Sequence, residues 1–167
     1  MQNRGQILAC DLHENKLSLI RRTAQSLGVS ILEVQARDAR NPDPARIGKA
    51  DRVLCDAPCS GLGVIGKKPD IKYKSLDSIR ALPAIQYDIL CGAAQYVRPG
   101  GTLVYSTCTL NPDENEHIVA QFLAEHPDFT AVDFDLGPAG VSECGMRTFY
   151  PQQDGCDGFF IAKMIRS

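Results

Sequence analysis

Residues 52–66 read RVLCDAPCSGLGVIG, and this stretch decides the fold. Its first part, Arg52–Asp56, is a short apolar run that is typical of a buried strand, and Ser60–Gly66 is a glycine-rich loop. Farther along, Pro83 is placed to open a helix, and Thr102–Ser106 (TLVYS) forms the next strand. Strands that alternate with helices in this way indicate an α/β sandwich with a mostly parallel sheet.

The same alternation continues on both sides of this stretch. Upstream, a helix at Asn15–Leu27 separates strands at Gln6–Asp11 and Ser30–Gln35. The remaining elements are a helix from Pro83 to a turn at residues 98–101 (RPGG), with Ile85, Ile89, Leu90, Ala93 and Val97 facing inward, a helix at Pro112–Glu125, and strands at Phe129–Phe134 and Phe159–Ile165. We expect one domain over residues 1–167, with ligands at the carboxyl ends of the strands.

Composition narrows the class of protein. Of the 167 residues, 44% are hydrophobic and 23% charged, as in ordinary globular proteins. The sequence has neither an apolar run of about 18 residues nor a signal-peptide pattern, so we expect a cytoplasmic protein that does not span a membrane. A net charge of −2 gives no long-range attraction for a polyanion, so any contact with RNA must be local.

The seven cysteines form no CxxC pair, so we expect neither structural disulfides nor structural zinc. Cys10, Cys55 and Cys91 lie inside apolar stretches and are interpreted as small core residues. The three histidines, at positions 13, 117 and 126, do not have metal-ligand spacing, and we expect them at the surface or at helix ends.

Three carboxylates follow predicted strands. Asp11 and Asp56 close their strands, and Asp38 comes shortly after another strand. Each could be a helix N-cap or lie in a solvated turn. Three together at strand ends favour a nucleoside-containing cofactor, whose hydroxyl and amino groups such acids bind, without indicating which one.

Two cysteines also lie just beyond strand ends, Cys59 after Arg52–Asp56 and Cys108 after Thr102–Ser106. Neighbouring parallel strands lie about 4.8 Å apart, so both thiols are expected to face one cleft. An isolated cysteine at such a place could be an inert buried thiol, but two beside Asp56 indicate a reactive site.

The motifs DAPCSGLGVI (56–65), KPDIKY (68–73), LVYSTCTLNPDENE (103–116) and DGFFIAK (157–163) resemble those of the Nop/Sun family of RNA cytosine-5 methyltransferases. The similarity runs from about Gly5 to Lys163 and is closest to the bacterial Sun (Fmu) type, which methylates ribosomal RNA of the small subunit. The resemblance implies a Rossmann-like fold, the cofactor S-adenosyl-L-methionine (AdoMet) and methyl transfer to carbon 5 of cytidine.

The resemblance also implies roles for single residues. Cys108 matches the family's nucleophile, which adds to carbon 6 of cytosine so that carbon 5 can attack the methyl group. Cys59 matches the cysteine that assists product release, and Asp56 the carboxylate between cofactor and base. Asp11 matches the acid that binds ribose, and Asp38 the acid near adenine. Without the family pattern the choice of nucleophile stays open, because DNA cytosine methyltransferases use the Pro-Cys thiol.

A basic segment follows the glycine-rich loop. Lys67, Lys68 and Lys72, with Lys74 and Tyr73 nearby, are expected to hold RNA phosphates while the target base is turned out of its stack. A solvated loop with ordinary lysines is the alternative. Two other functions remain open, a non-catalytic RNA-binding or assembly module and a cysteine hydrolase, although no histidine is close to either thiol in sequence.

The sequence departs from the family at its start. The first strand and its glycine-rich Pro-Gly-Gly-Lys loop, against which the methionine part of AdoMet lies, have no match in residues 1–6. We therefore expect the C-terminal part of a longer catalytic domain, with weak or no AdoMet binding and no activity alone. The lost strand belongs between those that end at Asp11 and Asp56, so homodimerisation through an exposed sheet edge is a further expectation.

Overall fold

The strand predicted at Arg52–Asp56 is β3 (Ala50–Asp56) in the computed structural model, which describes all residues 1–167. The chain forms two units, Met1–Pro42 and Asp43–Ser167. The expectation of one domain over residues 1–167 stays a prediction.

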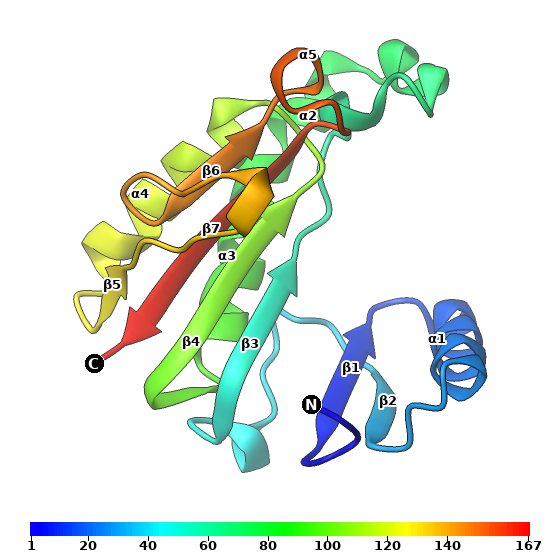
Figure 1. The fold of residues 1–167 in the computed structure, drawn as a ribbon, viewed down its shortest axis with the longest axis vertical. Coiled ribbons are helices and arrows are strands. Elements are labelled where there is room, and N and C mark those ends of the chain that lie inside the picture. The colour runs from blue at the N-terminus through cyan, green and yellow to red at the C-terminus, as the bar shows by residue number, and fades with distance from the viewer. The chain divides into compact units, whose positions relative to one another are not determined.

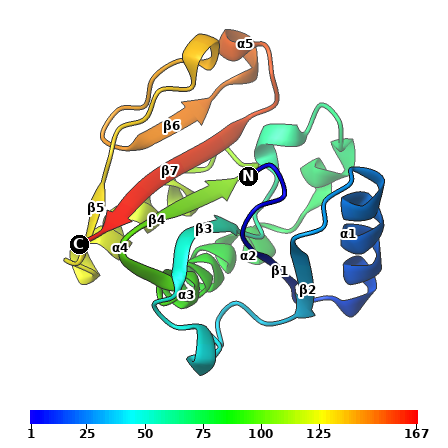
Figure 2. The same cartoon turned by 60° about the horizontal axis from the view of Figure 1, so that its bottom comes forward.

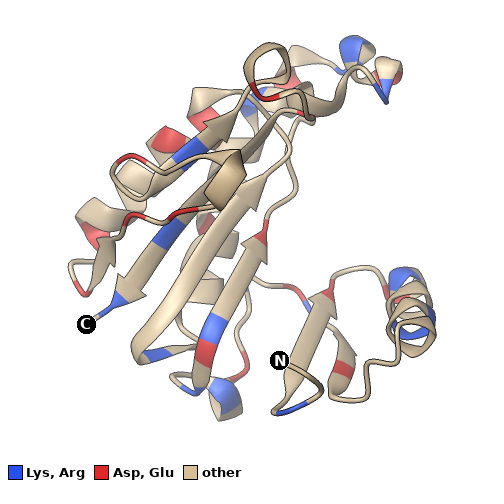
Figure 3. Ribbon diagram, in the orientation of Figure 1, with Lys and Arg blue, Asp and Glu red and all other residues tan.

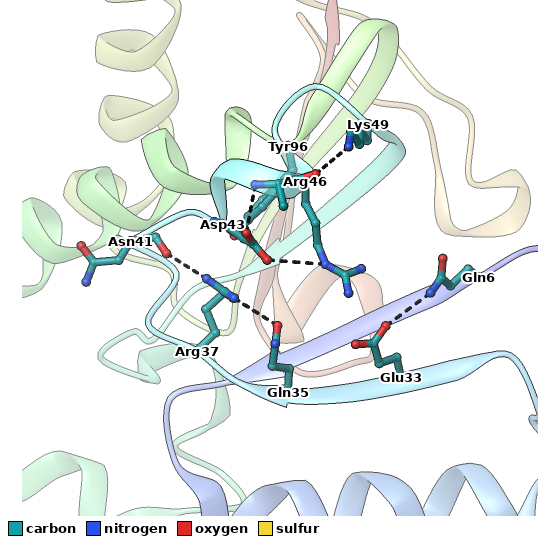
Figure 4. Close-up of polar contacts among 10 residues, drawn as sticks. Gln6, Glu33, Gln35, Arg37, Asn41, Asp43, Arg46, Lys49 and Tyr96 are labelled. Carbon is teal, nitrogen blue, oxygen red and sulfur yellow. Dashed lines mark hydrogen bonds and ion pairs between the residues drawn. The ribbon is translucent and has the colours of Figure 1, made fainter.

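The smaller unit contains β1 (Ile7–Asp11), α1 (Glu14–Ser26) and β2 (Leu32–Ala36) (Figure 1). The two strands are parallel, as predicted, and pair from Ile7↔Leu32 to Asp11↔Ala36. Polar contacts hold the strands and the segment that follows them (Figure 4). Gln6 Nε2 donates to Glu33 Oε2 at 3.3 Å, and the Arg37 guanidinium donates to the Gln35 side chain and to the Asn41 carbonyl.

The larger unit is built on a five-stranded sheet with the order β3-β4-β7-β5, in which β6 also pairs with β7 (Figure 1). Its other strands are β4 (Val97–Thr107), β5 (Phe129–Ala131), β6 (Met146–Phe149) and β7 (Phe159–Arg166). The α/β class is confirmed, but the expectation of a mostly parallel sheet is wrong for this unit. Only β3 and β4 are parallel, and β7 runs antiparallel to β4, β5 and β6.

Helices connect the strands. The α-helices are α2 (Leu76–Arg80), α3 (Leu82–Ala94), α4 (Glu116–Glu125) and α5 (Pro151–Asp154). Short 3-10 helices lie at η1 (Pro44–Arg46), η2 (Leu62–Val64), η3 (Pro69–Tyr73), η4 (Pro112–Glu114) and η5 (Gly137–Ala139). At η1, the Asp43 side chain accepts from Ala45 N–H and pairs with Arg46, and the Asp43 N–H donates to Tyr96 Oη (Figure 4). No helix of the chain has the length and apolar character needed to cross a membrane.

The core lies between the sheet and helices α3 and α4, which cover one face of it (Figure 2). The register places Cys55, Tyr105 and Ala162 in one row across β3, β4 and β7. Leu90 and Phe122, from α3 and α4, are fully buried against this face. Burial of these side chains supplies the main driving force for folding of the larger unit.

Several details differ from the sequence prediction. Ile85, predicted to face inward, is 38% exposed, whereas its neighbour Gln86 is fully buried. Residues 98–101 do not end the helix as a turn; they lie inside β4, where a shift of register between Ala50 and Arg52 marks an irregularity in the ladder. Cys10 is exposed rather than a core residue, whereas Cys55 is buried.

β1 and β3 each have an unpaired edge. Within its own unit, β1 pairs only with β2, and β3 pairs only with β4. Leu54 on β3 is 71% exposed. Homodimerisation through this edge stays a prediction.

Candidate active site

The two cysteines predicted to share a cleft lie together in the larger unit. The parallel pair β3 and β4 ends with Asp56 opposite Ser106, so the segments that follow them start side by side. The Sγ atoms of Cys59 and Cys108 are 3.1 Å apart. The expected juxtaposition is confirmed.

Burial sets the protonation state of the Cys59 thiol. It is the main cause that raises the pKa of Cys59 to about 12, and the hydrogen bond with Cys108 raises it further. Cys59 therefore stays a neutral thiol near pH 7, able to donate its S–H to the Cys108 sulfur.

Both sulfurs line a pocket of about 440 Å³. Its walls come from the loop after β3 and from the basic segment, and they include Gly61, Val64, Lys67, Lys68, Pro69, Asp70, Ile71 and Lys74. Lys74 Nζ donates to the Ser60 carbonyl at 2.8 Å, which places a cation beside the two thiols. The pocket thus combines a pair of thiols with positive charge.

A close backbone approach shapes this pocket. Gly63 N–H donates to the Cys108 carbonyl at 3.0 Å, and the Gly63 carbonyl accepts from Gly158 N–H at 2.8 Å. A Cβ atom at Gly63 would lie 2.1 Å from the Gly158 oxygen. Glycine at this position therefore ties the loop after β3 to Cys108 and to the start of β7.

The predicted RNA-binding lysines occupy the segment between β3 and α2, where Lys and Arg are blue in Figure 3. Lys67 pairs with Asp157 at 2.6 Å, and this contact raises the pKa of Lys67. Lys67 and Lys68 line the pocket, whereas Lys72 does not. Lys74, which was not among the three, has the most direct contact with the cysteine loop.

The three predicted acids are divided between the units. Asp56 is in the larger unit, where it accepts a hydrogen bond from Ser106 Oγ at 3.3 Å. Asp11 and Asp38 are in the smaller unit, where Asp11 ends β1 opposite Ala36 and Asp38 follows β2.

Asp11 and Asp38 have donors of their own. The backbone N–H of His13 is the main cause that lowers the pKa of Asp11, and Lys16 lies 3.3 Å from the same carboxylate. The side chain of Arg40 is the main cause that lowers the pKa of Asp38, and its Nη2 lies 2.6 Å from Oδ2. Both carboxylates are thus ionised acceptors at neutral pH, and Asp38 already holds a guanidinium.

Sequence reasoning missed a group of buried polar residues around the two cysteine loops. Ser60, Gln86, Thr107, Thr109, Glu114 and Asn115 are all fully buried. Glu114 and Asn115 belong to the NPDENE motif, and burial of such polar residues beside a strand end is the signal that could have identified them. Gln86 lies on the inward face of α3 in the place that was predicted for Ile85.

Histidine is absent from the walls of the cysteine pocket. His126, at the end of α4, lies 3.5 Å from the Cys91 sulfur, and His117 pairs with the exposed Asp113. The larger unit therefore offers no histidine base beside Cys59 or Cys108 for a cysteine hydrolase.

Comparison with known proteins matches this chain to a family. The family model described as 16S rRNA methyltransferase RsmB/F matches residues 1–165. The probable ribosomal RNA small subunit methyltransferase B of Bacillus subtilis (strain 168) is 42% identical over 98% of this chain and 38% of its own length. Ribosomal RNA small subunit methyltransferase B of Sodalis glossinidius is 40% identical over 97% of this chain and 36% of its own length.

Solved structures agree with this match. The crystal structure of NSun6 from Pyrococcus horikoshii with SFG has a TM-score of 0.84 and 34% identity, covering 99% of this chain and 42% of that one. A methyltransferase homolog protein from Pyrococcus horikoshii has a TM-score of 0.83 and 30% identity, covering 100% and 55%. The chain spans about two fifths of the length of these curated relatives. By its motifs, its fold and the match over nearly all of its residues, the chain belongs to the 16S rRNA methyltransferase RsmB/F family.

Proposed function

We propose that the native protein is an AdoMet-dependent RNA cytosine-5 methyltransferase that acts on small-subunit ribosomal RNA. The observation that carries the proposal is the 3.1 Å contact between Cys59 and Cys108 in a pocket with cationic walls. Cytosine methylation at carbon 5 needs such a thiol, because the unactivated ring is a poor nucleophile.

Cys108 is the nucleophile in this proposal. Its thiolate adds to carbon 6 of cytosine, and the electron pair displaced from the ring double bond makes carbon 5 nucleophilic. AdoMet, when bound, supplies the electrophilic methyl group. A base then removes the proton from carbon 5, the double bond re-forms, and the thiolate of Cys108 leaves. The neutral Cys59 thiol, whose pKa burial raises to about 12, assists this release step by donating its S–H to the departing Cys108 sulfur.

Asp56 acts on the pyrimidine. Thiolate addition develops charge on the ring, and a carboxyl group that shares a proton with the ring stabilises that charge. Asp56 ends β3, three residues before Cys59, and its exposed side chain is held by the Ser106 hydroxyl. The basic segment, with Lys67 and Lys68 in the pocket wall, binds the RNA phosphates.

The chemistry of Asp11 and Asp38 suits the nucleoside part of AdoMet. Ribose hydroxyls and the adenine amino group are donors, and an ionised carboxylate offers about four acceptor positions. Asp11 uses one oxygen for His13 N–H and the other for Lys16, which leaves acceptor capacity for ribose. Asp38 is held on both oxygens by Arg40, so Arg40 must yield before adenine can bind there.

Serine substitutions in the native protein test the assignment. We expect Cys108→Ser to abolish tritium release from carbon 5 of labelled cytidine in ribosomal RNA and to leave no covalent RNA adduct. We expect Cys59→Ser to let the Cys108 adduct accumulate, because release is impaired. Denaturing gel electrophoresis detects the adduct.

Cys156→Ser is the matched control, because Cys156 is exposed and lies outside the pocket. Its tritium release should equal that of the wild type. An adduct trapped by Cys108→Ser would refute the choice of nucleophile. RNA binding without tritium release in the wild type would favour a non-catalytic binding module.

A further inference from the structure

The tripeptide Pro58-Cys59-Ser60 is held by hydrogen bonds on both sides of Cys59. The Pro58 carbonyl accepts a hydrogen bond from Gln86 Nε2 at 2.8 Å, and the Ser60 N–H donates to Glu114 Oε2 at 2.8 Å. Gln86 Nε2 also donates to Glu114 Oε2 at 2.9 Å. The Gln86 amide and the Glu114 carboxylate are therefore bonded to each other, and together they fix the backbone immediately before and after Cys59.

The tripeptide Thr107-Cys108-Thr109 is held in the same manner by the side chain of Asn115. Thr107 Oγ1 donates to Asn115 Oδ1 at 2.6 Å, and Asn115 Nδ2 donates to the Thr109 carbonyl at 3.0 Å. One amide thus contacts the residues on both sides of Cys108. A direct bond of 2.7 Å between the Ser60 and Thr109 hydroxyls joins the two tripeptides.

The holding residues are themselves fixed. Asn111 Nδ2 donates to Glu114 Oε1 at 3.0 Å, and Tyr105 Oη donates to the Glu114 carbonyl at 2.8 Å. Glu114, Asn115 and Gln86 are fully buried, so water cannot replace a contact that is lost. The buried Gln86 Oε1 has no hydrogen-bond partner. The amide nitrogen, by contrast, donates to two acceptors, the Pro58 carbonyl and Glu114 Oε2. The amide orientation is therefore dictated by Pro58 and Glu114.

We propose that Glu114 and Asn115 are positioning residues, each for one thiol: Asn115 sets the place of Cys108 for attack, and Glu114, acting with Gln86, sets the place of Cys59 for release. This assignment rests on the proposed function and deepens it. Because the two positioning residues contact different tripeptides, their loss affects different steps. A misplacement of about 1 Å at a reacting group can cost on the order of 100-fold in rate.

Isosteric substitutions break these contacts without a change of volume. Asn115→Asp places an oxygen where Nδ2 donates to the Thr109 carbonyl. Glu114→Gln places an amide among three donors, so at least one of them loses its acceptor. Asp113→Asn is the matched control, because it makes the same kind of change on η4 at an exposed residue that contacts His117.

Two RNA substrates separate the steps in the native protein. RNA with 5-fluorocytidine reports attack, because fluorine at carbon 5 cannot leave as a proton and the adduct stays. RNA with ordinary cytidine reports release, because the adduct accumulates only when release is slow. We expect Asn115→Asp to slow adduct formation with fluorocytidine by about 10- to 100-fold. We expect Glu114→Gln to form that adduct at nearly the wild-type rate but to accumulate the adduct with ordinary cytidine.

The outcomes distinguish this proposal from the proposed function. If the wild type forms no adduct with fluorocytidine RNA, both fail. If the wild type forms the adduct and both variants slow attack and release in the same proportion, the separate positioning roles fail. Should either variant be unfolded by circular dichroism, the milder substitutions Thr107→Val and Gln86→Met, which remove contacts from the same two groups, give the same comparison.

Discussion

Gly63 has no room for a side chain, and we expect this one residue to control the shape of the cysteine pocket. In Gly63→Ala, the new Cβ would lie 2.1 Å from the Gly158 oxygen and 2.9 Å from the Cys108 oxygen. Because both neighbours are backbone, the loop must move. The substitution should destabilise the native protein by about 1–3 kcal/mol and displace Cys108. Urea unfolding measures the first effect and tritium release the second.

Gly66→Ala is the control for this prediction. Gly66 belongs to the same loop, but a Cβ there meets no atom within 4 Å. Its free energy of unfolding should stay within about 0.5 kcal/mol of the wild-type value, as for most surface substitutions. Equal effects of the two substitutions would show that the close approach at Gly63 is unimportant.

At the residue scale, the sequence identified the thiols but not what holds them. Cys59 and Cys108 were predictable because each follows a strand end, and two parallel strand ends meet. Gln86 was not, because a polar residue between apolar ones on a helix reads as solvent-facing. Its burial depends on the Pro58 carbonyl and on Glu114, both distant in sequence.

At the scale of elements, local pattern located most strands but not their pairing. β1 and β3 begin within two residues of their predicted starts, since short apolar runs indicate strands directly. The direction of β7 was not predictable, because alternation along a strand is the same in both orientations. The segment Pro99-Gly100-Gly101 is typical of a turn, but it lies inside β4, between the two residues of β4 that pair with Ala50 and Arg52 of β3.

A prediction at this scale concerns the basic segment between β3 and α2. Lys68→Ala should weaken RNA binding and reduce the slope of log K against log salt by about one, as for one lost phosphate contact. Asp157→Asn should strengthen binding, because the 2.6 Å ion pair that partly neutralises Lys67 is lost. Filter binding at several salt concentrations measures both effects.

Lys49→Ala is the control, since Lys49 is exposed and immediately precedes β3, whereas the pocket follows the other end of that strand. Its RNA affinity should equal that of the wild type. If Lys68→Ala and Lys49→Ala behave alike, the segment is a solvated loop with ordinary lysines.

At the scale of the whole molecule, we expect the 167-residue chain alone to bind AdoMet weakly. The sequence contains no Pro-Gly-Gly-Lys segment whose backbone could approach AdoMet closely. In addition, the Arg40 guanidinium already pairs with the Asp38 carboxylate. A lost hydrogen bond to a charged group removes about 1.5–3 kcal/mol, so two losses raise a micromolar Kd by roughly 150- to 25,000-fold. Calorimetric titration measures this Kd, and a value near micromolar would contradict the prediction.

Arg40→Ala in the same titration separates the two causes. If competition by Arg40 limits binding, the variant should bind AdoMet more tightly, because Asp38 is released from the guanidinium. If the missing glycine-rich segment limits binding, the affinity should stay unchanged. Tyr73→Ala, a substitution of an exposed side chain in the larger unit, is the control.

Glu114 and Asn115 are consecutive in the chain, yet each contacts a different cysteine loop. A single peptide bond therefore sets the spacing between the anchor of one thiol and the anchor of the other. Protein engineers who transfer this site to another scaffold would have to move residues 111–115 as a block, together with Gln86 and the two cysteine tripeptides. Loop length is adjustable elsewhere on the surface, but an insertion between these two residues would separate the anchors by the rise of a whole residue.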